Sequence, residues 1–368
     1  KVLEGTNMLV LKVTTDTPKN SIDIIRTIMD NYSSVSLYTV GSAVMDVLEE
    51  PKVPYMPDNP LNAGEEAKKG GLAAGALIIL LLGLISYTRD TIKQEKEVEK
   101  KLDAKSLGAI SYEWKYKTVR ELLQHKNRAI LVDDPVASFR FVESYKKLAA
   151  KVDYRMAKED RKVLVITSVS ENEGKSTVAA NLAITLAEQS KKVLLIDGDI
   201  RRPSQFLILG MEPKDENELG EYLKGNGTFK DIIMTCPRKH MLFIGGKNCY
   251  STSTELLSSD SFSKLVKACR KKVDYIIIDT PPIGLIGDAQ LFAHHADAVM
   301  IIARQNYMLA EDINEAIDDF RDDGNKVLGV ALNGVRTFSG LVDSPVGHYY
   351  GKYSKYGRYG NYGKSKGM

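Results

Sequence analysis

The sequence predicts an α/β fold in which a mostly parallel β-sheet carries helices on both faces. Short apolar runs rich in β-branched residues recur through the C-terminal part of the chain, as expected for strands buried on both faces. Stretches with helical periodicity separate these runs, and this alternation is typical of parallel sheets. The first run leads into a Gly-Lys-Ser-Thr turn that opens a helix, which is the context of a phosphate-binding loop. We therefore expect the fold of a P-loop NTPase.

An apolar run at 71–87, GLAAGALIILLLGLISY, holds 17 residues without a charge. As a helix it would measure roughly 26 Å, the short end of a membrane span. A buried core helix is the alternative, but the run is apolar on all sides. Basic residues are more frequent after it than before it, so the positive-inside rule places the C-terminal side in the cytoplasm. We predict a transmembrane helix at 70–88, in the cell (inner or plasma) membrane.

Residues 1–69 are then expected to be extracytoplasmic, as part of an α+β domain. A loosely alternating stretch at 9–15 predicts a strand, and 18–32 predicts a helix. Prolines at a strict three-residue spacing follow, which favours an extended polyproline spacer: Pro51, Pro54, Pro57 and Pro60. Because the chain begins with Lys1, we expect that further residues precede it.

Behind the span, residues 89–135 are charged or mixed and are predicted to form a helical stalk and a linker. A globular domain is expected at 136–338 and a low-complexity tail at 339–368. The formal net charge of +3 is too small to indicate nucleic-acid binding. The three cysteines form no CxxC pair, which predicts free thiols rather than a metal site.

The phosphate-binding segment follows the apolar strand KVLVIT and reads SVSENEGKST. Backbone N–H groups at the start of the next helix suit phosphate oxygens. Lys175 can reach the β- and γ-phosphates, and Ser176 can offer its hydroxyl to Mg²⁺. The motif is imperfect, because Val169 stands where the strict pattern has glycine. The predicted nucleotide-binding residues are Glu173, Gly174, Lys175, Ser176, Thr177 and Arg201.

Acidic residues end two further predicted strands. The segment KVLLIDGDIRRP places Asp197 and Asp199 after one strand, and VDYIIIDTPP places Asp279 at the end of another. Ligands bind at the carboxyl edge of such sheets, where carboxylates can hold Mg²⁺ or accept a proton. A solvated turn is the alternative for the first pair. Two more apolar runs complete at least five strands: AVMIIA at 298–303 and KVLGVAL at 326–332.

The C-terminal tail is rich in tyrosine, glycine and basic residues and holds no aliphatic residue among its tyrosines, so it cannot form a packed core. Three interpretations compete: a kinase's own substrate cluster, a nucleic-acid-binding segment in which aromatics stack on bases, and a passive low-complexity tail. The candidate phosphoacceptors are Tyr349, Tyr350, Tyr353, Tyr356, Tyr359 and Tyr362.

Three nucleotide segments in this order, between a membrane span and a tyrosine-rich tail, resemble the bacterial tyrosine kinases of the Wzc/CpsD type. ITSVSENEGKST matches the Walker A motif of that family, VLLIDGDIR matches its second acidic motif, and YIIIDTPP matches its Walker B strand. The N-terminal part resembles the end of a Wzz-type polysaccharide chain-length regulator domain. The resemblance favours the substrate-cluster interpretation of the tail, and we expect no nucleic-acid partner.

The resemblance implies a role for each matching position. Lys175 would hold the phosphates of ATP, and the Mg²⁺ ligands would be Ser176, Asp199 and Asp279. Asp197 would be the candidate base for the tyrosine hydroxyl, although the sequence alone does not separate it from Asp199. The implied catalytic residues are therefore Lys175, Asp197 and Asp199, with ATP and Mg²⁺ as cofactors.

The implied function is an ATP-dependent protein-tyrosine autokinase that regulates capsular or exopolysaccharide polymerisation and export. Its partners would be the tail of a neighbouring subunit in a homo-oligomer, cytoplasmic protein substrates, the export machinery and a cognate tyrosine phosphatase. Two departures stand out. The ring-building ExxRxxR motif of the family keeps Glu143 but has Lys146 and Ala149 at the arginine positions, so the ring is not implied. Asn172 replaces a frequent loop glycine and tolerates left-handed geometry.

Two alternatives remain open at this stage. A ParA- or MinD-like ATPase would share the fold, but its signature lysine is replaced here by Ser170. A membrane scaffold, or polysaccharide co-polymerase, would bind nucleotide with little turnover. Absence of phosphotyrosine would favour the scaffold.

Overall fold

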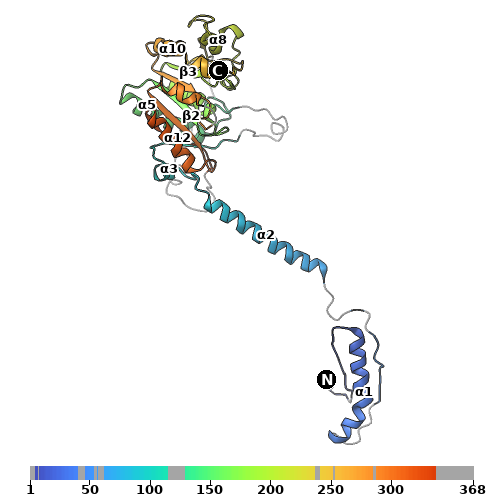
Figure 1. Cartoon of the computed structure of the whole chain (residues 1–368). Coiled ribbons are helices and arrows are strands. Elements are labelled where there is room, and N and C mark those ends of the chain that lie inside the picture. The colour runs from blue at the N-terminus through green and yellow to red at the C-terminus, as the bar shows by residue number, and fades with distance from the viewer. Residues whose placement is uncertain are drawn as a thin grey trace, which may run out of the picture. The chain divides into compact units, whose positions relative to one another are not determined.

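The computed structural model separates the chain into two compact units, Lys1–Ser86 and Tyr87–Met368 (Figure 1). The residues it describes are 5–6, 8–39, 46–53, 56, 62–114, 129–236, 241–251, 253–284 and 287–336.

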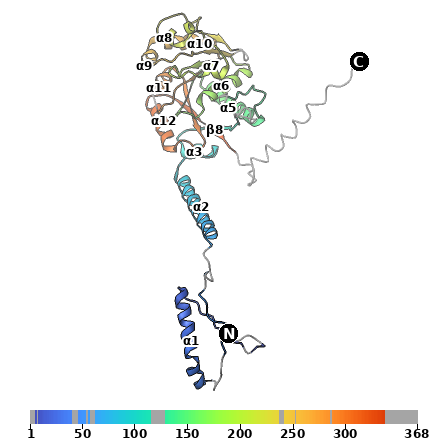
Figure 2. The same ribbon diagram turned by 90° about the vertical axis from the view of Figure 1, so that its right-hand side faces the viewer.

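The first unit contains helix α1 (Pro18–Thr39) and most of helix α2 (Ala63–Thr88) (Figure 2). Proline is favoured at the first position of a helix, and α1 begins at Pro18, the first residue of the predicted stretch 18–32. The hydroxyl of Thr17 accepts a hydrogen bond from the amide of Asn20 at 3.4 Å. The predicted strand at 9–15 is wrong, since these residues hold only one isolated bridge position. Of the four spaced prolines, only Pro51 lies within the described residues.

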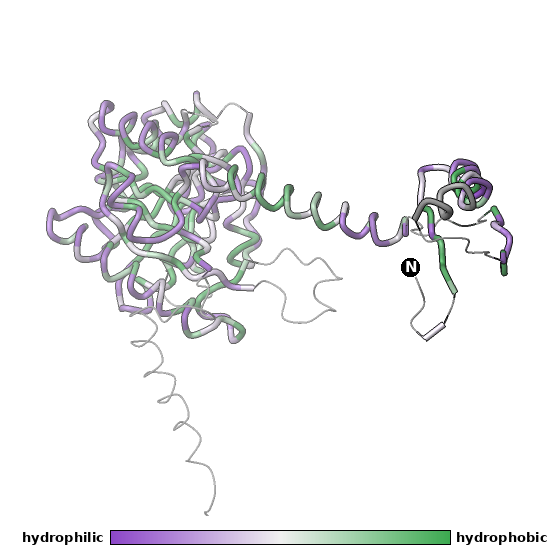
Figure 3. Tube along the Cα trace, turned by 90° about the horizontal axis from the view of Figure 1, so that it is seen from below, coloured by the Kyte–Doolittle hydropathy of each residue, from purple (hydrophilic) through white to green (hydrophobic). Residues whose placement is uncertain are grey.

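Helix α2 contains the predicted membrane span. It has 26 residues, a window of mean hydropathy 2.1 and no buried residue. Figure 3 shows its hydrophobic residues gathered toward the Thr88 end. Among the described helices it is the one that is long and apolar enough to cross a membrane. A core helix of a soluble protein would be buried, so the core-helix alternative is not supported.

The second unit is built on an eight-stranded sheet in the order β1-β8-β7-β2-β6-β3-β5-β4. All described pairs are parallel except β4–β5, which confirms the mostly parallel sheet. The strands are β1 (Ser106–Ser111), β2 (Val163–Ser168), β3 (Val193–Asp197), β4 (Met234–Thr235), β5 (Met241–Ile244), β6 (Tyr275–Asp279), β7 (Ala298–Arg304) and β8 (Val327–Val335).

Both faces of this sheet are buried. Successive side chains of a strand point to opposite faces, and in β2 Val163 and Val165 belong to one apolar cluster while Leu164 and Ile166 belong to the other. Helices α5 (Phe139–Ala157) and α6 (Lys175–Glu188), side by side in Figure 2, cover one face. The opposite cluster receives α3 (Glu95–Lys101), α8 (Leu219–Leu223), α9 (Ser253–Leu257), α10 (Asp260–Arg270), α11 (Asp288–Ala293) and α12 (Ala310–Asp322).

The region predicted as stalk and linker is largely part of this fold. Strand β1 pairs with β8, and Val98 of α3 is fully buried. The amide of Ala310 donates to the carbonyl of Asp90 at 2.8 Å. The compact domain therefore starts close to residue 89, and the predicted start at 136 was too late. Sequence reasoning missed this part of the domain because charged residues dominate the segment around α3. The apolar side chains of the segment that pack inward are few: Ile92, Val98, Leu102, Leu107 and Ile110.

Candidate active site

The turn after β2 has the backbone geometry of a phosphate-binding loop. Asn172 has φ 62° and Gly174 has φ 87°, both left-handed. Asn172 thus adopts the conformation expected of it. Glycine is favoured at Gly174 by its φ, and a Cβ atom there would also lie 2.3 Å from Nδ2 of Asn333, which would have to move. The loop delivers Lys175 as the first residue of α6.

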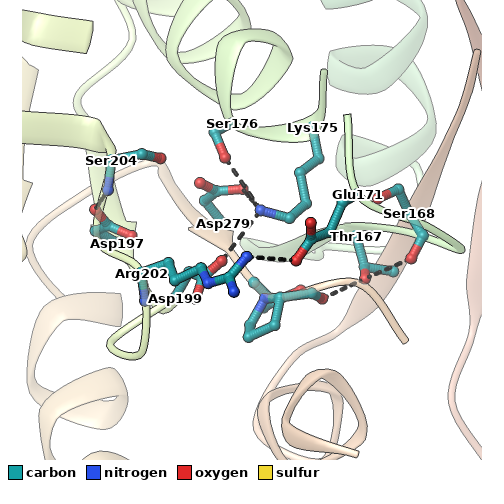
Figure 4. Close-up of polar contacts among 12 residues, drawn as sticks. Thr167, Ser168, Glu171, Lys175, Ser176, Asp197, Asp199, Arg202, Ser204 and Asp279 are labelled. Atoms are coloured by element: carbon teal, nitrogen blue, oxygen red, sulfur yellow. Dashed lines mark hydrogen bonds and ion pairs between the residues drawn. The ribbon is translucent and has the colours of Figure 1, made fainter. Parts of the chain in front are cut away.

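Lys175 lies among side chains from three strand ends (Figure 4). Its Nζ is 3.3 Å from Oδ2 of Asp199, 3.2 Å from Oγ of Ser176 and 4.0 Å from Oδ1 of Asp279. Strand β6 lies between β2 and β3, so all three strands deliver their polar residues to one edge of the sheet. The structure therefore brings Lys175, Ser176, Asp199 and Asp279 together.

Charge and burial act against each other in this cluster. Burial lowers the pKa of Lys175, but the charges of Asp279, Asp199 and Asp197 outweigh it and the pKa is raised. Burial raises the pKa of Asp279, and the neighbouring Lys175 opposes that shift. Lys175 therefore stays cationic and is suited to hold phosphate oxygens.

The structure separates Asp197 from Asp199. Oδ2 of Asp197 accepts the amides of Ser204 and Gln205, at 3.0 and 2.9 Å, at the start of α7 (Gln205–Leu209). Burial, together with the charge of Asp279, raises the pKa of Asp197 to about 8. Asp199 faces Lys175 instead, and its Oδ1 accepts the amide of Arg202 at 3.1 Å.

Gln205 is a site residue that sequence reasoning missed. Its fully buried side chain donates from Nε2 to Oδ2 of Asp279 at 2.8 Å and to the carbonyl of Ser176 at 2.9 Å. Gln205 thus fixes the Walker B carboxylate against the start of α6. No motif marks it, because its position depends on how the turn after β3 folds back onto α6.

The buried side chain of Glu173 accepts hydrogen bonds from two backbone amides. Its Oε1 accepts the amide of Ser170 at 2.8 Å, and its Oε2 accepts the amide of Arg304 at 2.9 Å. Burial raises the pKa of Glu173 to about 7, while these backbone amides act to lower it. The side chain fastens the loop to the end of β7, so a nucleotide contact from Glu173 has to come from its main chain.

Arg201 does not join the cluster around Lys175. Its Nε donates to Oδ2 of Asp288 at 3.0 Å, and its Nη2 donates to Oγ1 of Thr254 at 3.2 Å. Thr177 lies half-buried in the first turn of α6. The six candidate phosphoacceptor tyrosines lie outside the described residues.

The described residues fit a nucleotide together with a divalent cation. Oδ1 of Asp197 and Oδ1 of Asp279 are buried and have no hydrogen-bond partner in the part of the chain that the structure describes. Carboxylate oxygens are the ligands that hard divalent cations prefer. No group of three or more described His, Cys, Asp or Glu residues could hold a metal alone. Such a cation would therefore need further ligands, which nucleotide phosphates supply.

Comparison with known proteins decides the family. A family model described as an AAA domain matches residues 161–330. Tyrosine-protein kinase CpsD of Streptococcus agalactiae serotype III is 33% identical over 211 residues, which are 56% of this chain and 89% of that protein. This chain belongs to the bacterial tyrosine-protein kinases of the Wzc/CpsD type. The kinase has a P-loop site for ATP, and the ParA/MinD-like alternative is not supported.

Two further relatives agree with this assignment. Tyrosine-protein kinase Wzc of Salmonella typhimurium is 29% identical over 239 residues, which are 64% of the kinase described here and 32% of that protein. The kinase domain of Escherichia coli tyrosine kinase ETK matches with a TM-score of 0.59 at 24% identity, covering 69% of this chain and 98% of that domain. At this identity the second match supports the fold.

Proposed function

We propose that this kinase transfers the γ-phosphate of ATP, with Mg²⁺, to tyrosines of its own C-terminal cluster. The observation that carries the proposal is the position of Lys175 between Asp199 and Asp279, at the start of a helix. A helix N-terminus and a lysine attract phosphates, and the carboxylates complete a metal site. The proposed acceptors are Tyr349, Tyr350, Tyr353, Tyr356, Tyr359 and Tyr362.

Each side chain has a distinct proposed role. Lys175 and the first amides of α6 hold the phosphates, and Ser176, Asp199 and Asp279 are the proposed Mg²⁺ ligands. Bound Mg²⁺ would neutralise charge on the phosphate oxygens. Asp197 is the candidate base, because its pKa is raised to about 8 and its carboxylate, once deprotonated, is a stronger base than an ordinary one. Its Oδ1 has no hydrogen-bond partner among the described residues.

The cellular setting is also a proposal. Helix α2 supports a membrane protein whose kinase domain is cytoplasmic. The relatives named CpsD and Wzc are tyrosine-protein kinases, and a further relative from Klebsiella pneumoniae is described as lying in a cps region. By this likeness we propose a role in capsular or exopolysaccharide export. The proposed partners are neighbouring subunits, cytoplasmic substrates, the export machinery and a phosphatase.

The deciding experiment is phosphotyrosine mapping by mass spectrometry. The chain and its Lys175→Met variant are expressed in a host without tyrosine kinases. We expect phosphate on several tail tyrosines of the unmodified chain and none in the variant, because methionine cannot hold phosphate oxygens. A second variant with all six tail tyrosines changed to phenylalanine should keep ATP binding but lose these phosphates.

An unmodified tail in the parent chain, despite measurable ATP binding, would contradict autophosphorylation of the cluster. It would favour a membrane scaffold with little nucleotide turnover.

A further inference from the structure

The two adjacent arginines after Asp199 have different surroundings. Arg201 is fixed by Asp288, whose buried carboxylate also accepts hydrogen bonds from the hydroxyls of Ser253 and Thr254. These three donors satisfy the carboxylate and tie the loop after β3 to α9 and α11. Releasing Arg201 would leave a buried carboxylate without its counter-charge, which is costly. Arg201 therefore has a structural role, as the counter-charge of Asp288.

Arg202 instead faces the phosphate-binding loop. Its Nη1 donates to Oε1 of Glu171 at 2.7 Å, while its amide is held by Asp199 at 3.1 Å. Figure 4 shows its guanidinium between Asp199 and Glu171, on the side of the cluster where Lys175 lies. The side chain is 77% exposed and that of Glu171 is 47% exposed. Arg202 thus reaches from the loop after β3 to the phosphate-binding loop.

The contact with Glu171 is easy to exchange. Exposed ion pairs contribute little to stability, because water screens the charges and the side chains lose freedom. A guanidinium offers several donors in a planar fork that matches phosphate oxygens. A nucleotide triphosphate carries more negative charge than the single carboxylate of Glu171. A triphosphate in the loop would therefore compete successfully for Arg202.

We infer that Arg202, held by Glu171 in the absence of nucleotide, is the arginine that contacts the transferring phosphoryl group. The inference rests on the proposed phosphate site. In the reaction the bond from the γ-phosphorus to the oxygen bridging to ADP breaks, and a bond to the tyrosine oxygen forms. ADP leaves with the electron pair, and the tyrosine proton passes to Asp197. Arg202 stabilises the negative charge on the γ-phosphoryl oxygens during this transfer.

The test compares binding of Mg²⁺–ADP with binding of a non-hydrolysable Mg²⁺–ATP analogue, using the full chain in detergent. In Arg202→Gln we expect unchanged ADP affinity, analogue affinity reduced about 10-fold, and kcat reduced about 10²-fold, as for loss of one charge-stabilising donor. Arg202→Lys should recover only part of the loss, because it cannot make a bidentate contact. Glu171→Gln should strengthen analogue binding, since it removes the competitor for Arg202.

Arg140→Gln, an exposed arginine at the start of α5, serves as the matched control and should leave both affinities unchanged. Equal losses for ADP and analogue in Arg202→Gln would overturn the inference, as would no loss for either. A Glu171→Gln variant that weakens analogue binding would also overturn it, because the pair would then support the loop itself. If the parent chain binds neither nucleotide, the proposed phosphate site fails instead.

Discussion

Asp197 and Asp279 are register partners on the adjacent parallel strands β3 and β6. Two buried carboxylates at neighbouring positions repel each other, and Lys175 offsets this repulsion only in part. Repulsion between the two carboxylates lowers the stability of the folded protein. Active sites commonly carry such a loss of stability, because their charged groups are placed to bind a ligand. The protein without nucleotide should therefore become more stable when one of these charges is removed.

We predict that Asp197→Asn stabilises the nucleotide-free protein at pH 9 while it lowers kcat. The asparagine oxygen still accepts the two α7 amides, and its NH₂ group takes the place of an oxygen without a partner. Removal of an unsatisfied buried charge should contribute on the order of 1–3 kcal/mol, or roughly 4 °C in Tm for a domain of this size. Thermal unfolding followed by circular dichroism measures the difference.

The pH dependence of that difference has a definite sign. The pKa of Asp197 is raised to about 8 in the folded protein, so the carboxyl holds a proton that the unfolded chain loses near pH 4. The stabilising contribution of this proton is fully present below pH 4 and is lost progressively as the pH rises from 4 to 8. The variant should therefore match the parent chain near pH 4, and its advantage in stability should grow with pH until it levels off by pH 9. Asp318→Asn, at an exposed position, is the control. A difference in stability between Asp197→Asn and the parent chain that stays constant from pH 6 to pH 9 would contradict the prediction.

Asn181 of α6 performs a structural task at the same scale. Its fully buried amide accepts from the amide of Val132 at 2.8 Å and donates to the carbonyl of Ile130 at 3.1 Å. It thereby binds the irregular segment at 130–132 to α6. Sequence reasoning could not assign this role, because an asparagine inside an apolar helix has many structural explanations.

We expect Asn181→Ala to lower stability by about 2–4 kcal/mol, because two buried backbone groups lose their partners. Urea unfolding measures this loss directly. Gln189→Ala, which is exposed at the end of the same helix, should change stability by less than about 0.5 kcal/mol. Equal losses of stability for the two substitutions would show that the buried hydrogen bonds of Asn181 do not contribute to stability.

At the scale of elements, the segment from Asp90 to Ser111 packs against the rest of the second unit along its length. Beyond the β1–β8 pairing, Nε2 of Gln305 donates to the carbonyl of Lys93 at 2.8 Å, and Nδ2 of Asn314 donates to the carbonyl of Lys101 at 2.9 Å. This segment also protects strand β8, which would otherwise be an open edge.

A chain shortened to begin at residue 89 should fold, whereas one that begins at 136 should aggregate or unfold at a much lower temperature. The second loses the packing of Val98, Leu102 and Leu107 and exposes the edge of β8. Each large buried side chain contributes roughly 1.5–3 kcal/mol. Size-exclusion chromatography and thermal unfolding distinguish the two chains. Equal melting temperatures would contradict the structural boundary.

Helix α5 also bears on assembly. At the positions of the family's ring motif, Lys146 forms an ion pair with Glu143 of the same helix at 2.9 Å, and Ala149 is buried. Ala149 is therefore used in the core of the domain, whereas the ion pair of Lys146 is partly exposed and contributes little to stability. The ring that the family motif would build has no support from this helix, as the substitutions of its arginines indicate.

At the scale of the whole molecule, helix α2 should decide where the kinase works. Arginine at the centre of a spanning helix costs roughly 2.5–3.5 kcal/mol on insertion scales. We predict that the double substitution Leu80→Arg and Leu81→Arg releases the protein from sedimented membranes, while ATP binding is kept. Alkaline extraction followed by immunoblotting measures the release. Lys68→Gln, before the apolar run, is the control, and membrane retention of the double variant would contradict a spanning role.

The sequence by itself determined five of the eight strands, β2, β3, β6, β7 and β8, together with the helix that follows the phosphate-binding loop and the family. Buried strands and the turns at their ends are local patterns that need no knowledge of distant residues. It also placed Lys175, Ser176, Asp199 and Asp279 at one edge of the sheet, because the carboxyl ends of parallel strands meet at that edge.

Only the tertiary structure decided which of these side chains face one another. It placed Asp197 against α7, paired Arg201 with Asp288, turned Glu173 inward and brought in Gln205. It also added β1, whose pairing with β8 joins residues more than 200 positions apart in the sequence. Such contacts depend on how loops return to the sheet, and no local pattern of residues records that path.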